Sequence, residues 1–475
     1  MASHTASLTK FYGQGPIASN FVSASSPYVP SEAICSAPHG VQHLEVPPLS
    51  DGSMAPGKTA VFELPTELDL ITKIGLRFAL GSMTAGGAVC HWTQGIGYAC
   101  IEEIVMQFGT ERLQTIRGGD ELFCKVLNMY EDEDRNNQMA LAGFDTVPNL
   151  VTKAQHGHNV INFNLLTLLH FGLGGDPGHA FPIRMLGEKV KISIKFRPAS
   201  QWATSFNAGG VTVTGSSGSS AITTTTINAP NIFNTTSINP GLYIEGQHIF
   251  EDERQMHEAL ACKPRRMLFS EQQLVKNVRF GAAQSTVNQV LTVEMRELTQ
   301  PVASAFVLIR WGDDLDRTCG DVARGVGRGY DPWNVGGWYD NAGTVPATNL
   351  PLVRSMRIDS GGTLFPLQET EINTLLQYEH SRKFKGTWSA AIPHWTYSHD
   401  PSRPNAVLGF LDFSLIDNPR MRLTLQNPGA SATIGAAAVN DTASATSELD
   451  ITVVCFTHNL LHTHQNALFH PFNGG

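Results

Sequence analysis

The sequence predicts an all-β protein made of two consecutive sandwiches, and three observations lead to this prediction. Only 16% of the 475 residues are charged, whereas 41% are hydrophobic, and an ordinary domain has about a quarter of its residues charged. The 44 glycines and 26 prolines favour turns between short strands over long helices. The chain is also too long for one ordinary domain, so it needs more than one core.

The first half contains the clearest strand. In the segment 189–196, Val190, Ile192, Ile194 and Phe196 alternate with lysine and serine residues. A strict period of two predicts a strand with one buried face and one face in water. Segments 60–65, 70–80 and 100–109 are also predicted strands.

One helix is expected between these strands, at residues 118–128. Asp120 is a candidate N-cap, because its short carboxylate can accept hydrogen bonds from the first backbone amides. The apolar residues of this segment recur at helical spacing and predict a buried stripe. They are Leu122, Phe123, Val126 and Leu127.

Strands resume in the second half at 265–274, 287–298, 304–311 and 449–455. A hairpin is predicted within 397–425, with strands Val407–Phe413 and Met421–Leu425 on either side of the turn Asp417-Asn418-Pro419. Proline fixes its own backbone, and aspartate and asparagine cap turns with their side chains. The layout of strands, inserted loop and further strands therefore occurs twice.

These patterns divide the chain into four parts. Residues 1–50, rich in serine, proline and alanine, form an N-terminal arm, either a poorly ordered leader or an arm that becomes ordered on assembly. The first sandwich spans 51–250 with a loop insertion at 201–240, where Gly, Ser, Thr and Asn are too dense to fill a core. A linking helix at 251–261 precedes the second sandwich, 262–475, which has a loop insertion at 312–345 and ends in a C-terminal tail.

Charge and cysteine usage limit the functional class. The net charge is −9, and no basic run is longer than Arg265-Arg266, so we expect no direct nucleic acid binding. The seven cysteines never show CxxC spacing and indicate reduced thiols. There is neither a signal peptide nor an apolar run of about 18 residues. We therefore expect a protein made in the cytoplasm, not secreted, with no transmembrane segment.

No motif demands catalysis, and we expect no enzyme, no cofactor and no metal site. The histidine pairs His156/His158 and His458/His462, with His464 and His470, lack the third and fourth ligands of a zinc site. The acidic run 131–134 lacks the spacing of a calcium loop and indicates a solvated helix end. The glycines near 325–329 do not follow a strand and open a helix, as a phosphate loop requires. Possible glycosylation sites are Asn234 and Asn440.

The hairpin segment resembles a signature near the end of the major capsid proteins of nucleocytoplasmic large DNA viruses, of the iridovirus, phycodnavirus and marseillevirus kind. The matching residues are Tyr397, Ser398, Asp400, Pro401, Phe413, Ser414, Ile416, Asp417 and Asn418. Leu415 stands where the family usually has arginine. Residues 241–261 resemble the closing strand of the family's first jelly roll, with Gln255 in place of a second arginine.

The resemblance implies a fold, a function and partners. The fold is two consecutive eight-stranded jelly-roll sandwiches with long loop insertions and a few short helices. The function is that of a major capsid protein that forms homotrimeric, pseudo-hexameric capsomers and tiles an icosahedral shell. Its partners are itself, neighbouring capsomers, and minor capsid, cement and penton proteins, and the shell overlies an internal membrane in the virion.

Three other classes stay open. A β-sandwich protein that binds glycans or a receptor would use aromatic platforms such as Trp333, Trp338 and Tyr339. A cupin-like metalloenzyme would hold metal on the tail histidines. A minor capsid protein of the same virus is the nearest alternative, although such proteins usually have one roll, and this chain has room for two.

Overall fold

The structure is a computed structural model of the whole chain. It describes residues 39–49, 56–80, 89–129, 132–145, 164–172, 180–198, 201–206, 213–215, 218–220, 241–249, 265–280, 290–311, 333, 353–360, 367–372, 374–375, 392–401, 407–425, 449–464 and 467–469. In this part of the chain, no helix has the length and apolar character needed to cross a membrane.

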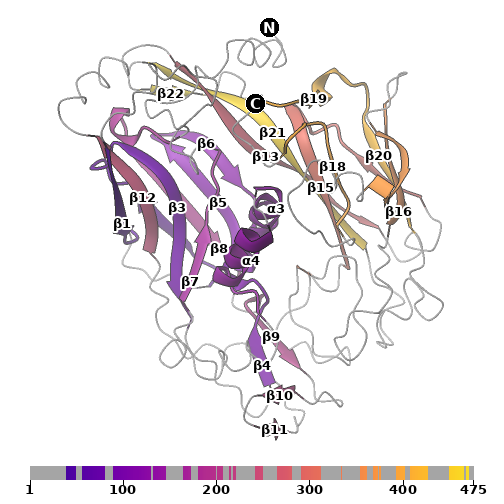
Figure 1. Cartoon of the computed structure of the whole chain (residues 1–475), viewed down its shortest axis with the longest axis horizontal. Helices are drawn as coiled ribbons and strands as arrows, with labels where there is room; N and C mark the ends of the chain where they lie inside the picture. Colours follow the sequence, from indigo (N-terminus) through magenta and orange to yellow (C-terminus); the bar gives the residue numbers. More distant parts are fainter. Residues whose placement is uncertain are drawn as a thin grey trace.

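Two β-sandwiches lie side by side, with a pair of helices between them (Figure 1). One sheet of the first sandwich has the strand order β1-β12-β3-β7 and the other β2-β8-β5-β6. The strands are β1 (His39–Val46), β2 (Thr59–Glu63), β3 (Leu70–Ala79), β5 (Ile101–Phe108), β6 (Glu111–Ile116), β7 (Asn164–Leu168), β8 (Val190–Phe196) and β12 (Gly241–Ile249).

The second sandwich has one sheet in the order β13-β21-β15-β18 and another in the order β14-β20-β16-β17. Its strands are β13 (Arg265–Phe280), β14 (Val290–Glu294), β15 (Pro301–Trp311), β16 (Val353–Asp359), β17 (Leu367–Glu371), β18 (His394–Thr396), β20 (Arg420–Leu425) and β21 (Leu449–His464). The short strands β19 (Leu411–Asp412) and β22 (Ala467–Phe469) pair with β15 and β21.

The two sandwiches have the same topology. When the eight main strands of each are numbered from one to eight, both give one sheet in the order 1-8-3-6 and another in the order 2-7-4-5. All of these pairings are antiparallel. Two four-stranded antiparallel sheets in this order form a jelly roll. The duplication expected from the layout of the sequence is therefore confirmed at the level of strand order.

Each sandwich encloses its own apolar core. On β8 the buried residues Val190, Ile192, Ile194 and Phe196 alternate with more exposed lysine and serine residues, as the sequence predicts. Strand β20 repeats the pattern with Met421, Leu423 and Leu425 facing the second core. This alternation fixes the register, since a slip by one residue would turn every apolar side chain towards water.

Helices are few and short. They are α2 (Ile96–Ala99), α3 (Gly119–Met129), α4 (Asp132–Leu141) and the 3-10 turns η4 (Ile183–Met185) and η8 (Phe413–Leu415). Two small antiparallel pairs extend from the first sandwich (Figure 1): β4 (Val89–Trp92) with β9 (Ala203–Phe206), and β10 (Val213–Gly215) with β11 (Gly218–Ser220).

The predicted strand Val407–Phe413 is wrong over most of its length. Only Leu411 and Asp412 are extended and paired, and the 3-10 turn η8 follows them. The Asp412 carboxylate accepts hydrogen bonds from the Ser414 backbone N (3.0 Å) and from Ser414 Oγ (2.6 Å). Local side-chain bonds of this kind compete with strand pairing, and Gly409 at φ 134° also interrupts it.

The predicted helix at 118–128 is present as α3, and its predicted apolar stripe is buried. The predicted N-cap is wrong, because α3 begins at Gly119 and Asp120 already lies in its first turn. The Asp120 carboxylate instead pairs with Arg310 of the second sandwich.

The boundaries differ from the sequence prediction in two places. Strand β1 lies within the expected arm 1–50, yet it pairs with β12 along its whole length. As an edge strand it turns only Leu44 and Val46 towards the core, so its sequence has a weak apolar pattern. The expected loop 201–240 contains β9, β10 and β11. The linking helix 251–261 lies outside the described residues, as does the loop 312–345 except for Trp333.

Candidate functional site at the interface between the two sandwiches

Helix α3 is shared by the two sandwiches. Leu122 and Val126 lie one turn apart and belong to the core of the first sandwich. Phe123 and Leu127, on the neighbouring stripe, belong to a separate apolar cluster with residues of the second sandwich. One short helix therefore has two buried faces, and each side chain that it buries contributes about 1.5–3 kcal/mol.

This interface cluster covers the outward face of the sheet β13-β21-β15-β18. From that sheet it includes Phe306, Leu308, Val454 and Phe456, all almost fully buried. The rings of Phe306 and Phe456 meet edge to face at 5.6 Å, an arrangement that aromatic pairs prefer. His394 of β18 stacks on Phe306 at 5.5 Å. The second sandwich is therefore apolar on both faces of this sheet.

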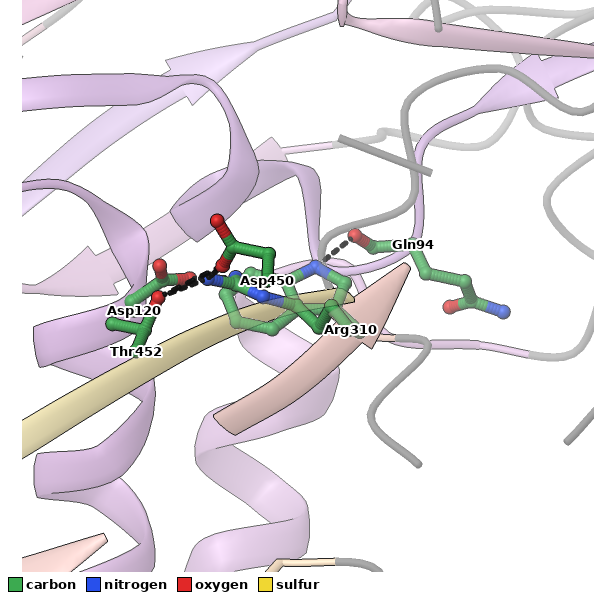
Figure 2. A network of polar contacts seen from close by, with 6 residues as sticks. Gln94, Asp120, Arg310, Asp450 and Thr452 are labelled. Carbon is green, nitrogen blue, oxygen red and sulfur yellow. Dashed lines mark hydrogen bonds and ion pairs between the residues drawn. The ribbon is translucent and has the colours of Figure 1, made fainter. Parts of the chain in front are cut away.

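A network of charged and polar side chains lies buried in this apolar interface. Arg310 of β15 has 2% of its side chain exposed and donates to Asp120 Oδ1 of α3 at 2.8 Å. Its guanidinium also reaches Thr452 Oγ1 at 2.8 Å and Asp450 Oδ1 at 3.4 Å, both on β21. Figure 2 shows the guanidinium of Arg310 directed towards Asp120 and Thr452, with Asp450 next to it. An arginine whose planar fork spans two elements fixes their relative position, because its hydrogen bonds require one geometry.

A second polar contact joins α3 to the signature segment. Asn128 Nδ2 donates to the carbonyl oxygen of Pro401 at 3.0 Å, and both residues are buried. Together with the Arg310–Asp120 pair it ties both ends of α3 to the second sandwich. The helix is therefore held against translation along its axis as well as against separation.

Trp333 is the described residue of the loop 312–345, and it packs against the first sandwich. Its Nε1 donates to the Gln94 carbonyl oxygen at 2.6 Å. Its ring lies 4.6 Å from that of Phe123 and 5.6 Å from that of Phe144. Trp333, which the glycan-binding alternative would use as an aromatic platform, is partly buried in this packing. Trp338 and Tyr339 lie outside the described residues.

The signature residues shape one end of the second sandwich. The backbone N of Tyr397 donates to the Ala303 carbonyl oxygen at 2.8 Å, which fastens this segment to β15. The Tyr397 ring lies 6.1 Å from that of Phe413, next to the second core. Ser398 is buried, and its hydroxyl accepts from the Asp400 backbone N at 3.3 Å. These contacts hold the segment against β15 and the second core.

The end of the signature forms the turn before β20. Ile416 is buried in the second core, and Asp417 is exposed. Asn418 adopts a left-handed backbone with φ 52°, and its Oδ1 accepts from Arg296 Nε at 2.6 Å. Leu415 is 68% exposed, so an arginine at this position, as in the resembled family, would also lie on the surface.

The described residues contain no group of three or more His, Cys, Asp or Glu side chains that could hold a metal. His458 and His462 both belong to β21, where four residues span about 13 Å. Their helical spacing therefore does not bring them together. His156, His158, His470 and the possible glycosylation sites Asn234 and Asn440 lie outside the described residues.

Burial changes the acid–base behaviour of several groups. It raises the pKa of the Cys124 and Cys455 thiols well above the usual range, so neither is a reactive thiolate. Burial lowers the pKa of His458 to about 4. Burial, and then the nearby Lys125 ammonium, lower the pKa of His170 to about 3. Lys125 Nζ donates to the His170 carbonyl oxygen at 3.0 Å.

The sequence prediction missed Arg310. The available signal was the segment 305–311, in which the residues on both faces of the strand are apolar and only Arg310 is charged. A strand with two apolar faces is covered on both sides. A charge in such a strand then requires a buried partner.

Replacement of the buried arginine tests the interface. The Arg310→Met variant leaves Asp120 and Asp450 without their cation, so the free energy of unfolding should fall by about 3 kcal/mol or more. Chemical denaturation measures this loss. The matched control is Arg357→Met on β16, whose ion pairs with Asp359 and Glu369 are partly exposed and should cost less than about 1 kcal/mol. Equal effects of the two variants would contradict the role given to Arg310.

Trp333 allows a graded test of the loop contact. Trp333→Phe keeps an aromatic ring and removes the Nε1 bond to Gln94, which should cost about 1 kcal/mol. Trp333→Ala also removes the ring contacts with Phe123 and Phe144, and should cost about 3 kcal/mol. Thermal unfolding of the two variants beside the wild type gives the comparison. An alanine variant as stable as the wild type would show that the ring does not contribute to this packing.

The buried histidines predict acid sensitivity. The pKa of His458 is lowered in the folded state, so its contribution to stability is complete above about pH 6.5 and is lost as the pH falls towards 4. Urea unfolding between pH 7.5 and 4.5 should show this decline, and His458→Leu should reduce the slope. An unchanged slope in the variant would mean that His458 does not cause the decline.

Residues 43–238 match the family model described as the N-terminus of the major capsid protein. No curated protein matches the chain.

Among solved structures, the fold resembles a chain of the quasi-atomic model of the PBCV-1 virus capsid with a TM-score of 0.65 and 16% identity, over 92% of this chain and 98% of that one. It resembles the Faustovirus major capsid protein with a TM-score of 0.62 and 10% identity, over 91% and 92% of the two chains. A chain of the Sputnik virophage structure matches with a TM-score of 0.51 and 9% identity, over 95% of each chain.

The resemblance expected from the signature hairpin is therefore confirmed. The chain has the double jelly-roll fold of these capsid proteins, and its residues 43–238 match the family model of the major capsid protein N-terminus.

Proposed function

We propose that the chain is the major capsid protein of a large DNA virus, and that three copies form a capsomer with a pseudo-hexagonal outline. The observation that carries this proposal is the identical strand order of the two sandwiches, which are joined through a buried interface. Two similar units per chain give six similar units per trimer. A ring of six closes on itself and leaves no unsatisfied end.

The interface between the sandwiches supports the same conclusion. A capsomer with six-fold outline requires each chain to keep its two sandwiches at one fixed angle. Arg310, Asp120 and Asn128 restrict that angle through hydrogen bonds, and the surrounding apolar cluster supplies the burial energy. A flexible linker between two separate domains would not restrict the angle in this way.

The role of the protein is structural and non-catalytic in this proposal. The capsomers tile an icosahedral shell, with minor capsid, cement and penton proteins as further partners. The shell overlies an internal membrane and is assembled in the host cytoplasm. The net charge of −9 supports the absence of direct contact with the genome, because a protein that coats nucleic acid usually presents a basic surface.

Mass in solution tests the proposal. Light scattering of the purified protein should give three times the chain mass of 51.5 kDa, and negative-stain images of the same peak should show six-sided particles. A stable, folded monomer at every concentration and salt condition would contradict the proposal. A glycan array on that monomer would then test the alternative of a glycan-binding sandwich.

A further inference from the structure

The sheet with the strand order 1-8-3-6 occurs in both sandwiches, but helix α3 covers its outward face in the second sandwich and does not cover it in the first. In the second sandwich, the outward face of β13-β21-β15-β18 is covered by helix α3, and Phe306, Val454 and Arg310 on it are at most 2% exposed. The equivalent sheet of the first sandwich is β1-β12-β3-β7, since both have the order 1-8-3-6. In the described part of the chain, helices α2 and α4 contact this sheet at its edge strand β7. His43, Glu45, Lys73 and Arg77 on its outward face are exposed, and we call this surface the open face (Figure 1).

Strand register defines the open face. Leu44 and Val46 of β1 and Leu242 and Ile244 of β12 pack in the first core, so the alternate residues point outward. The outward residues lie in rows across the strands. One row is Glu45, Tyr243, Gly75 and Leu168, and the next is His43, Glu245 and Lys73. Gly241, Arg77 and Leu166 form a third row.

The open face combines an exposed valine, a tyrosine and an arginine with the charged residues Glu45, Lys73 and Glu245. Val41 at its edge is 59% exposed. Tyr243 stacks on His43 at 5.4 Å, and its hydroxyl lies 2.7 Å from His43 Nδ1. Arg77 pairs with Glu45 at 2.8 Å. Tyrosine and arginine are enriched in the centres of interfaces, where they supply area and hydrogen bonds at low entropic cost.

Glycines make part of this face flat. A Cβ added at Gly241 would lie 2.6 Å from Glu45 Oε1, and one at Gly75 would lie 2.9 Å from Leu166 Cδ1. The neighbouring side chains therefore lie down over the two glycines. A surface of this shape admits the close approach of another packed element.

A closed ring determines what covers the open face. A ring of six sandwiches from three chains contains two kinds of contact, which alternate around the ring. In one, the first and second sandwiches of the same chain meet. In the other, the second sandwich of one chain meets the first sandwich of the next chain. Because the two sandwiches share one topology, an equivalent contact between chains would use the open face. We propose that the open face is the surface on which the second sandwich of another copy of this chain seats, an inference that rests on the proposed trimer.

Charge reversal at the open face tests this inference. Val41→Glu and, separately, Arg77→Glu should shift the light-scattering mass from about three chain masses towards one, or raise the trimer dissociation constant at least tenfold. The matched control is Lys191→Glu on β8, which is exposed on the wet face of the other sheet of the same sandwich and should remain trimeric. Circular dichroism establishes that each variant is folded.

Lysine labelling of the wild-type protein gives a second readout that needs no variant. Lys73 lies on the open face with 45% of its side chain exposed. In the trimer an amine-reactive reagent should label Lys73 several-fold more slowly than Lys191, and dilution to monomer should remove the difference.

The outcomes separate the two proposals. A trimeric wild type whose open-face variants stay trimeric, with Lys73 labelled as fast as Lys191, would overturn the open face as the interface and leave the proposed function standing. A wild type that is monomeric at every concentration would contradict the proposed function itself. Loss of the trimer in the control variant as well would also count against the open face.

Discussion

The relative placement of the two sandwiches depends on a buried arginine, Arg310, that lies between them. Arg310 projects from a strand with two apolar faces and binds Asp120 across the interface, with Asp450 and Thr452 beside it. Buried ion pairs often add little net stability, because removing two charges from water is expensive. Their main effect is to fix geometry, since only one arrangement satisfies all the hydrogen bonds. The apolar cluster around Arg310 therefore supplies the energy of association, and the arginine determines how the two sandwiches are placed.

The apolar outer face of one sheet explains why α3 is present. A jelly roll buries the inner faces of its two sheets and leaves the outer faces to water. The sheet β13-β21-β15-β18 is apolar outside as well, so it requires a cover. Helix α3 provides that cover from the first sandwich, because Leu122 and Val126 anchor it there while Phe123 and Leu127 face the second. A duplicated fold is thereby converted into one rigid unit.

The sequence predicts the parts of this structure that depend on local periodicity. The alternation in β8 and the helical stripe of α3 are visible in short windows, because each reflects one buried face. The strand expected at Val407–Phe413 fails because the Asp412 side chain satisfies local backbone donors, which an apolar pattern does not reveal. The Arg310–Asp120 pair spans 190 residues of sequence, and the Trp333–Gln94 bond spans 239. Contacts at such separations follow from the packing of whole sandwiches, so no local pattern predicts them.

The two sheets of the second sandwich differ in the charge of their outer faces. On the sheet β14-β20-β16-β17, Arg422 pairs with Asp359 at 2.6 Å and Arg420 with Glu294 at 3.7 Å. Exposed pairs of this kind contribute little to stability. A partner that covered this sheet would have to desolvate these charges, which costs free energy unless the partner pairs with them. The outer face of β13-β21-β15-β18 is apolar, and helix α3 covers it within the chain. The outer face of β14-β20-β16-β17 and the open face both carry ion pairs, so a partner that buries either of them must supply polar groups that satisfy those charges.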